Sequence, residues 1–238
     1  MTVNFEEWDR TINTDATDLD GKRKLYDDMK AELTNNETNK NNSEVLWRLN
    51  KVSLLLSISS DIETNQQRQL AFEALEYGKR SVKADPKSLD SHKWYCIALG
   101  RATKLVGVKD KIRYGHEFKQ HLDLAYKLDP NDHMLHFMAG RFAYELAALS
   151  WIERNIARAL YGPIPEATYQ EALQKFFDSD KSKPNWKDNY LWIAKTYRRL
   201  RKKTTARQWV NKGLNLPTNN IMDELAHKEL QQLKDKLS

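Results

Sequence analysis

Positive charge is concentrated at residues 198–203, where five of six positions are cationic: Arg198, Arg199, Arg201, Lys202 and Lys203. The dipole of a helix favours cations at its C-terminal end by about 0.3 to 1 kcal/mol each, so part of this cluster needs no partner. The helix dipole does not account for all five cations. The wider segment from Lys181 to Lys212 holds eleven Lys or Arg and a single acid, Asp188. Such a segment favours an acidic partner, and the alternative is a solvated helix face and turn.

A second candidate site is a column of cations that recur in an internal repeat: Lys51, Arg101, Arg141 and Lys195. The last three each follow one of the small residues Gly100, Gly140 and Ala194, and the first joins by a looser alignment. Facing a concave groove, these side chains would bind carboxylates or phosphates through charge-assisted hydrogen bonds. The alternative is internal pairing, as between Arg141 and Glu145 one turn later.

Enzyme chemistry has little support. His116 and His121 are five residues apart, which places them roughly 140° apart on a helix, unlike a metalloprotease pair. His133 and His136 could share a face, but no carboxylate cluster completes a metal site. Nucleophile elbows, phosphate-binding loops and dinucleotide fingerprints are missing from the sequence. We therefore expect no enzyme, no metal and no cofactor, and a zinc hydrolase using His116 and His121 is the weakest alternative.

Composition indicates a helical protein of a reducing compartment. The 238 residues are 30% charged and 40% hydrophobic, with only 8 Gly and 6 Pro, which is typical of a soluble helical chain. Cys96 is the single cysteine, which excludes an internal disulfide. It lies on an apolar segment and reads as a small buried residue. No secretory signal opens the sequence, and the apolar run at 52–58 is too short to span a membrane, which takes about 20 residues.

Helices must position the candidate residues, and prolines mark where these helices end. Each proline follows an amphipathic segment that it cannot continue: Pro86, Pro130, Pro184 and Pro217. The spacing and the small residues resemble tetratricopeptide repeats, whose period is about 34 residues. Two units carry insertions. The sequence predicts an all-α, tetratricopeptide-like array of antiparallel helix pairs with enlarged, degenerate repeats.

We expect two regions in the chain. Residues 1–42 are polar and read as an N-terminal arm and linker, partly helical or disordered. Residues 43–238 form the repeat domain, with units at about 43–86, 87–130, 131–184 and 185–217 and a capping helix at 218–238.

One long helix is expected in the third unit, because apolar residues recur at helical spacing from Leu135 to Ala159 without a proline. Gly140 costs about 1 kcal/mol relative to alanine in a helix interior, so we expect the backbone of another helix to pass close to it. Leu149 and Trp151 are expected to pack against a neighbour.

The third unit also resembles the central signature of the regulator of microtubule dynamics family. The matching strings are GRFAY (140–144), LSWIE (149–153), ARAL (157–160), Pro163, AT (167–168) and EAL (171–173), and EVLWRL (44–49) resembles the family's first repeat helix. The resemblance covers about residues 43–235. It implies a tetratricopeptide-like fold and association with microtubules and spindle poles. Some members have an N-terminal membrane anchor, and this sequence shows none.

Residues and resemblance together predict a non-enzymatic, cytoplasmic adaptor. It would bind the acidic tails of tubulin through its basic surface and support spindle or microtubule organisation and chromosome segregation, at the cytoskeleton, spindle and spindle pole. The alternative is a binding module for an acidic peptide or an anionic lipid headgroup in the groove. Nucleic acid is not expected, because no zinc-finger, homeodomain or RNA-recognition pattern occurs.

Overall fold

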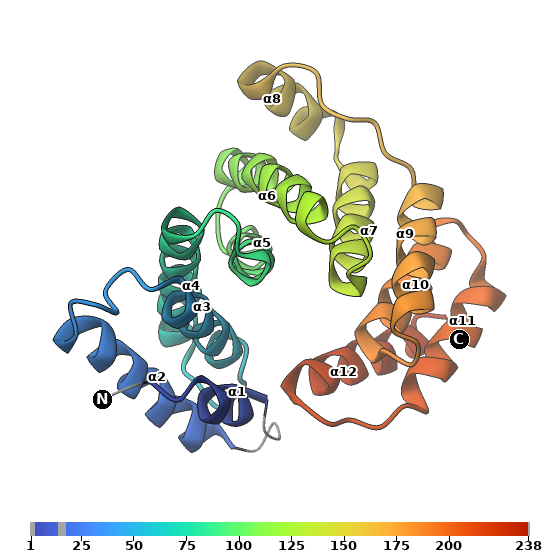
Figure 1. The fold of residues 1–238 in the computed structure, drawn as a ribbon. Helices are drawn as coiled ribbons and strands as arrows, with labels where there is room; N and C mark the ends of the chain where they lie inside the picture. The colour runs from blue at the N-terminus through green and yellow to red at the C-terminus, as the bar shows by residue number, and fades with distance from the viewer. Residues whose placement is uncertain (1–2, 14–17, 238) are drawn as a thin grey trace. The chain divides into compact units, whose positions relative to one another are not determined.

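The computed structural model describes residues 3–13 and 18–237, and these form twelve α-helices without a β-strand (Figure 1). The prediction of an all-α fold is confirmed. The chain divides into two compact units, Met1–Leu128 and Asp129–Ser238. Four helices end two or three residues before the four marker prolines, as expected from a residue that cannot continue a helix.

The first unit contains two pairs of consecutive helices and two helices before them. The helices are α1 (Phe5–Asn13), α2 (Leu19–Asn35), α3 (Ser43–Ser57), α4 (Thr64–Ala84), α5 (Leu89–Ala102) and α6 (Val108–Leu128). The pairs are α3 with α4 and α5 with α6. Helices α1 and α2 pack against α3, and Ile12, Met29 and Leu49 share one buried apolar cluster. The division of the chain at residue 42 stays a prediction.

The second unit also contains two helix pairs, together with two further helices. Its helices are α7 (His133–Ala148), α8 (Trp151–Tyr161), α9 (Tyr169–Ser182), α10 (Lys187–Arg199), α11 (Lys203–Leu214) and α12 (Ile221–Asp235). The pairs are α7 with α9 and α10 with α11, the further helices are α8 and α12, and α10 also packs with α9 and α12. Leu230 and Leu233 of α12 are buried against Leu191 and Val210. Helix α12 thus closes the array as the predicted capping helix.

Gly140 lies where α7 meets α9. A Cβ atom built on Gly140 would lie 2.6 Å from Cε1 of Phe176, a ring of α9 that is fully buried. Only a residue without a side chain allows this approach of the two helices. The prediction of a close helix is confirmed, but the prediction that its backbone makes the approach is wrong, because the nearest atoms belong to the Phe176 ring.

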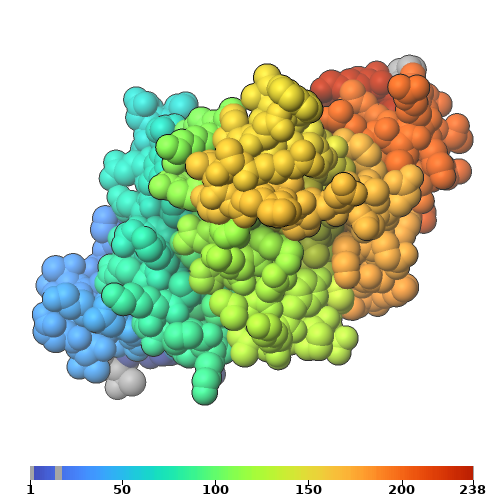
Figure 2. Space-filling view, turned by 90° about the horizontal axis from the view of Figure 1, so that it is seen from above, coloured from blue at the N-terminus to red at the C-terminus, as the bar shows by residue number. Residues whose placement is uncertain are grey.

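The predicted continuous helix from Leu135 to Ala159 is wrong, because the chain breaks between α7 and α8. Ser150 caps α8: its Oγ accepts from the Glu153 amide at 3.3 Å, and its own amide donates to Glu153 Oε2 at 2.9 Å. This reciprocal capping box starts a new helix. The packing predicted for Trp151 is also wrong, since 77% of this residue is exposed; Figure 2 shows α8 (yellow) at the surface.

Asn50 of α3 is a fully buried amide whose two polar side-chain atoms have no hydrogen-bond partner among the described residues. It lies against Gly78 of α4. The first helices of the four pairs are α3, α5, α7 and α10. Counted from the start of each of these helices, the residues equivalent to Asn50 are Cys96, Gly140 and Ala194, all small. Burying an unsatisfied amide costs about 1 to 3 kcal/mol.

Asn50→Ala is therefore expected to raise the free energy of unfolding by about 1 kcal/mol, measured by urea denaturation of the full chain. The matched control is Asn189→Ala. Asn189 is equally buried and its Oδ1 also lacks a partner among the described residues, but its Nδ2 donates to the Phe176 carbonyl at 3.0 Å, so this control should lose stability. Destabilisation by both substitutions to the same extent would contradict the assignment of Asn50 as unsatisfied.

Two histidines form a partly buried pair between α5 and α6. His92 Nε2 lies 2.9 Å from the Pro86 carbonyl oxygen, which only accepts, so Nε2 carries the proton. His92 Nδ1 then accepts from Nδ1 of His121 at 2.9 Å. Burial lowers the pKa of His121, the nearby His92 lowers it further, and Glu117 opposes both.

This pair predicts acid sensitivity of the first unit. Because the pKa of His121 is lower in the folded chain than in the unfolded chain, its contribution to stability is complete above the ordinary pKa of about 6.5. That contribution is lost progressively as the pH falls below this value. His121→Asn keeps a donor near the Nδ1 position without titrating. The variant should therefore show a smaller fall in Tm than wild type when thermal unfolding is measured at pH 7 and then at pH 5. An unchanged pH profile in the variant would contradict the role of His121.

Candidate functional site

The predicted column of cations coincides with one register of the first helices, with one correction. The first helices of the pairs start at Ser43, Leu89, His133 and Lys187. Eight residues after each start lie Lys51, Ile97, Arg141 and Lys195. Cys96, rather than Gly100, is therefore the counterpart of Gly140. The alignment of Gly100 with Gly140 was wrong by one helical turn, and Arg101 lies outside the column.

Burial explains this correction. Cys96 is fully buried, as predicted, and its Sγ lies 3.6 Å from the Phe118 carbonyl oxygen of the paired helix. A Cβ built on Gly100 would meet nothing within 4 Å. Gly100 therefore does not fill a contact between helices, and the proline spacing was the better guide to the register.

In the first unit both predicted cations are held by groups of the protein. Lys51 Nζ donates to Asn13 Oδ1 at 2.8 Å and lies 4.9 Å from the centre of the Trp94 ring. Burial lowers the pKa of Lys51, although Asp9 and Asp90 oppose the shift. Arg101 Nη2 donates to the carbonyl of Ser57 at 2.7 Å, at the end of α3. Burial also lowers the pKa of Arg101. Arg101 thus ties two first helices together.

In the second unit Arg141 and Lys195 meet on one indole ring. The Arg141 guanidinium lies 4.6 Å and the Lys195 ammonium 4.4 Å from the centre of Trp192. Lys195 also forms an ion pair with Glu229 of α12. Arg141 has no ion pair among the described residues, because its neighbours are the rings of Trp192 and Phe137. The structure therefore brings together two of the four predicted groove residues.

Aromatic side chains extend this arrangement. Tyr144 lies edge-on to both Trp192 and Tyr169, with ring centres 5.3 Å apart in each case. Arg199 Nε donates to the Tyr144 hydroxyl at 3.2 Å, and this bond raises the pKa of Arg199. We call Arg141, Tyr144, Trp192 and Lys195 the Trp192 cluster. Cations held over aromatic faces contribute about 0.5 to 2 kcal/mol each.

Trp94 and Trp192 are site residues that the spacing of the cations did not predict. Each lies five residues after the start of its helix, and each contacts the column cation of a first helix in the same unit. The sequence did contain a signal for them, because a tryptophan occurs at the same position in two repeat units. The repetition indicates that these cations are held partly by the array itself.

The five cations at 198–203, which we call the basic surface, are all exposed. They lie at the end of α10, in the turn and at the start of α11. Arg201 has a φ of 60°, while its amide donates to the Arg198 carbonyl at 3.0 Å. This left-handed conformation normally favours glycine and costs other residues about 1 kcal/mol or more. Within the described part of the chain, none of the five forms an ion pair.

Histidines suggested by the metal alternative lie in different surroundings. His116 contacts Gln120 on its own helix, whereas His121 contacts His92 of α5. The described residues contain no group of three His, Cys, Asp or Glu side chains arranged to hold a metal ion. Among the same residues, no helix is both long enough and apolar enough to cross a bilayer.

Comparison with known proteins gives one family. The model described as Regulator of microtubule dynamics protein 1-3 matches residues 5–238. Regulator of microtubule dynamics protein 2 of Homo sapiens is 34% identical over 196 residues, which cover 82% of this chain and 47% of that protein. Protein 1 of Bos taurus is 33% identical over 192 residues, covering 80% of this chain and 61% of that protein. The chain spans about half the length of the curated relatives it matches.

Solved structures show the fold. A thermophilic TPR protein of Thermus thermophilus superposes with a TM-score of 0.60 at 16% identity, covering 90% of this chain and 92% of that one. YrrB, described as a TPR protein with an unusual peptide-binding site, gives a TM-score of 0.50 at 14% identity and covers 98% of both chains. The predicted tetratricopeptide-like array is confirmed.

Proposed function

The chain belongs to the regulator of microtubule dynamics family, and from this premise we propose that it is a non-enzymatic adaptor that binds microtubules through its basic surface. The bound partner is the disordered acidic tail of tubulin. Through this contact the protein supports spindle or microtubule organisation and chromosome segregation, at the cytoskeleton, spindle and spindle pole of the cytoplasm.

The observation that carries this proposal is the exposure of the basic surface. Five cations without ion pairs to described residues lie within six consecutive positions, and Arg201 holds a backbone conformation that glycine would hold at lower cost. The second unit contains 18 Lys or Arg and 13 Asp or Glu, so most of the net charge of +6 lies there. A surface of one charge sign attracts an extended acidic segment.

Co-sedimentation with microtubules tests the proposal. Attraction between exposed charges is screened over about 8 Å at physiological ionic strength, so binding should weaken steeply as salt is added. Proteolytic removal of the tubulin tails should weaken it similarly. Binding that persists unchanged at high salt, or after the tails are removed, would contradict recognition of the tails.

A second candidate function uses the Trp192 cluster to bind an acidic peptide or an anionic lipid headgroup. Convergence of Arg141 and Lys195 on one ring favours it, and YrrB is a fold relative described by its peptide-binding site. The double substitution Arg141→Glu and Lys195→Glu separates the two functions. It should abolish peptide or lipid binding and leave microtubule binding unchanged if the cluster is a distinct site.

A further inference from the structure

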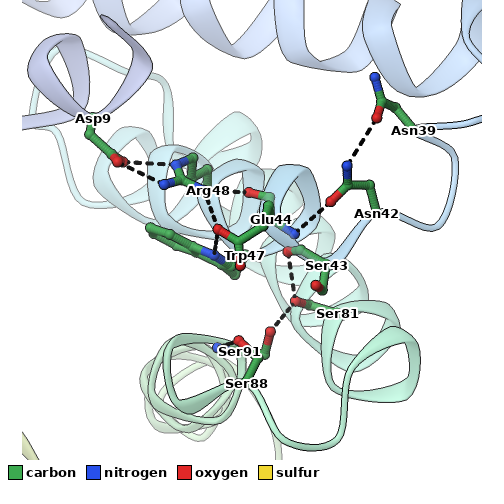
Figure 3. Close-up of polar contacts among 10 residues, drawn as sticks. All are labelled: Asp9, Asn39, Asn42, Ser43, Glu44, Trp47, Arg48, Ser81, Ser88 and Ser91. Atoms are coloured by element: carbon green, nitrogen blue, oxygen red, sulfur yellow. Dashed lines mark hydrogen bonds and ion pairs between the residues drawn. The ribbon is translucent and has the colours of Figure 1, made fainter. Parts of the chain in front are cut away.

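A buried arginine of α3 is bound by a carboxylate from α1. Arg48 Nε donates to Asp9 Oδ1 at 2.9 Å and Nη2 donates to Asp9 Oδ2 at 2.8 Å, so the pair is bidentate (Figure 3). Nη1 donates to Glu44 Oε2 at 2.7 Å on α3 itself. Arg48 is only 7% exposed. Bidentate pairs of this kind fix the orientation of the carboxylate as well as its position.

Aromatic rings complete the surroundings of Arg48. Its guanidinium carbon lies 4.1 Å from the centre of Trp47 on α3 and 4.5 Å from the centre of Phe5 on α1. The Phe5 and Asp9 side chains are one helical turn apart and both contact the same guanidinium. A planar cation recognised by a ring and a carboxylate from one helix is a specific contact.

Lys51 extends the site by one turn of α3. Its Nζ donates to Asn13 Oδ1, the last residue of α1. Two contacts one turn apart on each helix show that α1 lies along α3. Lys51 belongs to the column of cations that recurs in Arg141 and Lys195, so α1 covers the first-unit part of the predicted groove face.

The sequence of α1 shows which kinds of side chain pack on this face of α3. Phe5, Trp8 and Ile12 recur at helical spacing on its packed side, and Ile12 is buried against α2 and α3. Glu6 and Glu7 are exposed on the other side, and α1 as a whole has three acids and one cation. Of the three acids only Asp9 faces α3, where its charge complements that of Arg48.

Helix α1 is also short enough to be displaced. It has nine residues, and isolated helices below about 12 to 15 residues are marginal in water. Its contacts are with α2 and α3. The Asp9 side chain remains 36% exposed in its pair with Arg48. A longer helix with the same side chains would compete for Arg48 and Lys51.

We propose that the face of α3 bearing Arg48 and Lys51 is a binding site for an acidic amphipathic helix of a partner protein, and that α1 occupies this site until the partner displaces it. The partner helix presents an aromatic residue, a second aromatic three positions later, a carboxylate next to it and an aliphatic residue three positions further. This site lies in the first unit and is independent of the microtubule contact.

Fluorescence anisotropy with the full chain tests this site. The probe is a labelled, acetylated and amidated peptide with the sequence of residues 3–13. Asp9→Lys in the chain should release α1 and raise the affinity for the probe at least tenfold over wild type. Glu6→Lys makes the same charge change on the exposed side of α1 and should leave the affinity unchanged.

A charge swap keeps the test decisive. The chain carrying Arg48→Glu alone sets Asp9 against a carboxylate and so releases α1; it should lose the wild-type probe and bind a probe carrying Asp9→Lys, which also reports that the variant is folded. Saturable binding that Arg48→Glu does not alter would overturn the proposal. Failure of the Asp9→Lys chain to bind the wild-type probe would overturn it as well, and neither result affects co-sedimentation with microtubules.

Discussion

Phe176→Ala is expected to lower the free energy of unfolding by about 3 to 5 kcal/mol. Phe176 is fully buried on α9, where its ring centre lies 5.9 Å from that of Phe137 and 6.3 Å from that of Trp192. It packs directly against Gly140 of α7. Alanine would leave a cavity at the junction of three helices of the second unit. Urea denaturation followed by tryptophan fluorescence measures the loss.

Gly140→Ala tests the same contact, because its effect on stability should change sign when Phe176 is removed. With Phe176 present, the added methyl group overpacks the junction, which typically costs about 1 to 3 kcal/mol. In the Phe176→Ala chain the ring is gone, and alanine should stabilise α7 by about 1 kcal/mol. Gly100→Ala is the matched control in an open helix position and should be stabilising by a similar amount. Stabilisation by Gly140→Ala in the wild-type chain would contradict the contact.

Much of the fold could be predicted because proline and helical periodicity act locally. A proline stops a helix whatever surrounds it, so helix ends near Pro86, Pro130 and Pro184 followed from sequence. The break at Ser150 was missed because the apolar spacing of α7 continues in phase into α8. Its local signal was present, since Ser150 and Glu153 have the spacing of a capping box.

The candidate site could be predicted only in part, because the residues that hold its cations are distant from them in sequence. Arg141 was placed in the register by its spacing from Pro130. The Lys195 partner Glu229 and the Lys51 partner Asn13 are 34 and 38 residues away, and no periodicity reveals such pairs. Arg101 was misplaced because Gly100 resembled a packing glycine, whereas the packed residue of that helix is Cys96.

Neutralising the basic surface is expected to reduce microtubule affinity at least tenfold, which corresponds to about 1.4 kcal/mol of binding free energy. Replacing Arg198, Arg199, Arg201, Lys202 and Lys203 by glutamine removes five charges and keeps polar side chains. These residues are exposed and form no ion pairs with described residues. The fold should therefore tolerate the change, since exposed substitutions usually alter stability by about 0.5 kcal/mol or less. Arg199 loses only its hydrogen bond to Tyr144.

A matched variant separates this surface from net charge. Five exposed lysines of the first unit serve as the control, each changed to glutamine: Lys24, Lys79, Lys83, Lys87 and Lys109. Both variants lose five positive charges, so non-specific attraction to the acidic microtubule falls equally in both.

Microtubule co-sedimentation of the two five-fold variants beside wild type, at physiological ionic strength, tests microtubule binding through the basic surface most directly. We expect the variant at residues 198–203 to lose at least tenfold in affinity and the first-unit variant to stay within about twofold of wild type, since specific contacts rather than total charge decide the difference. Equal losses in the two variants, or no binding by the wild-type chain, would contradict the proposed function.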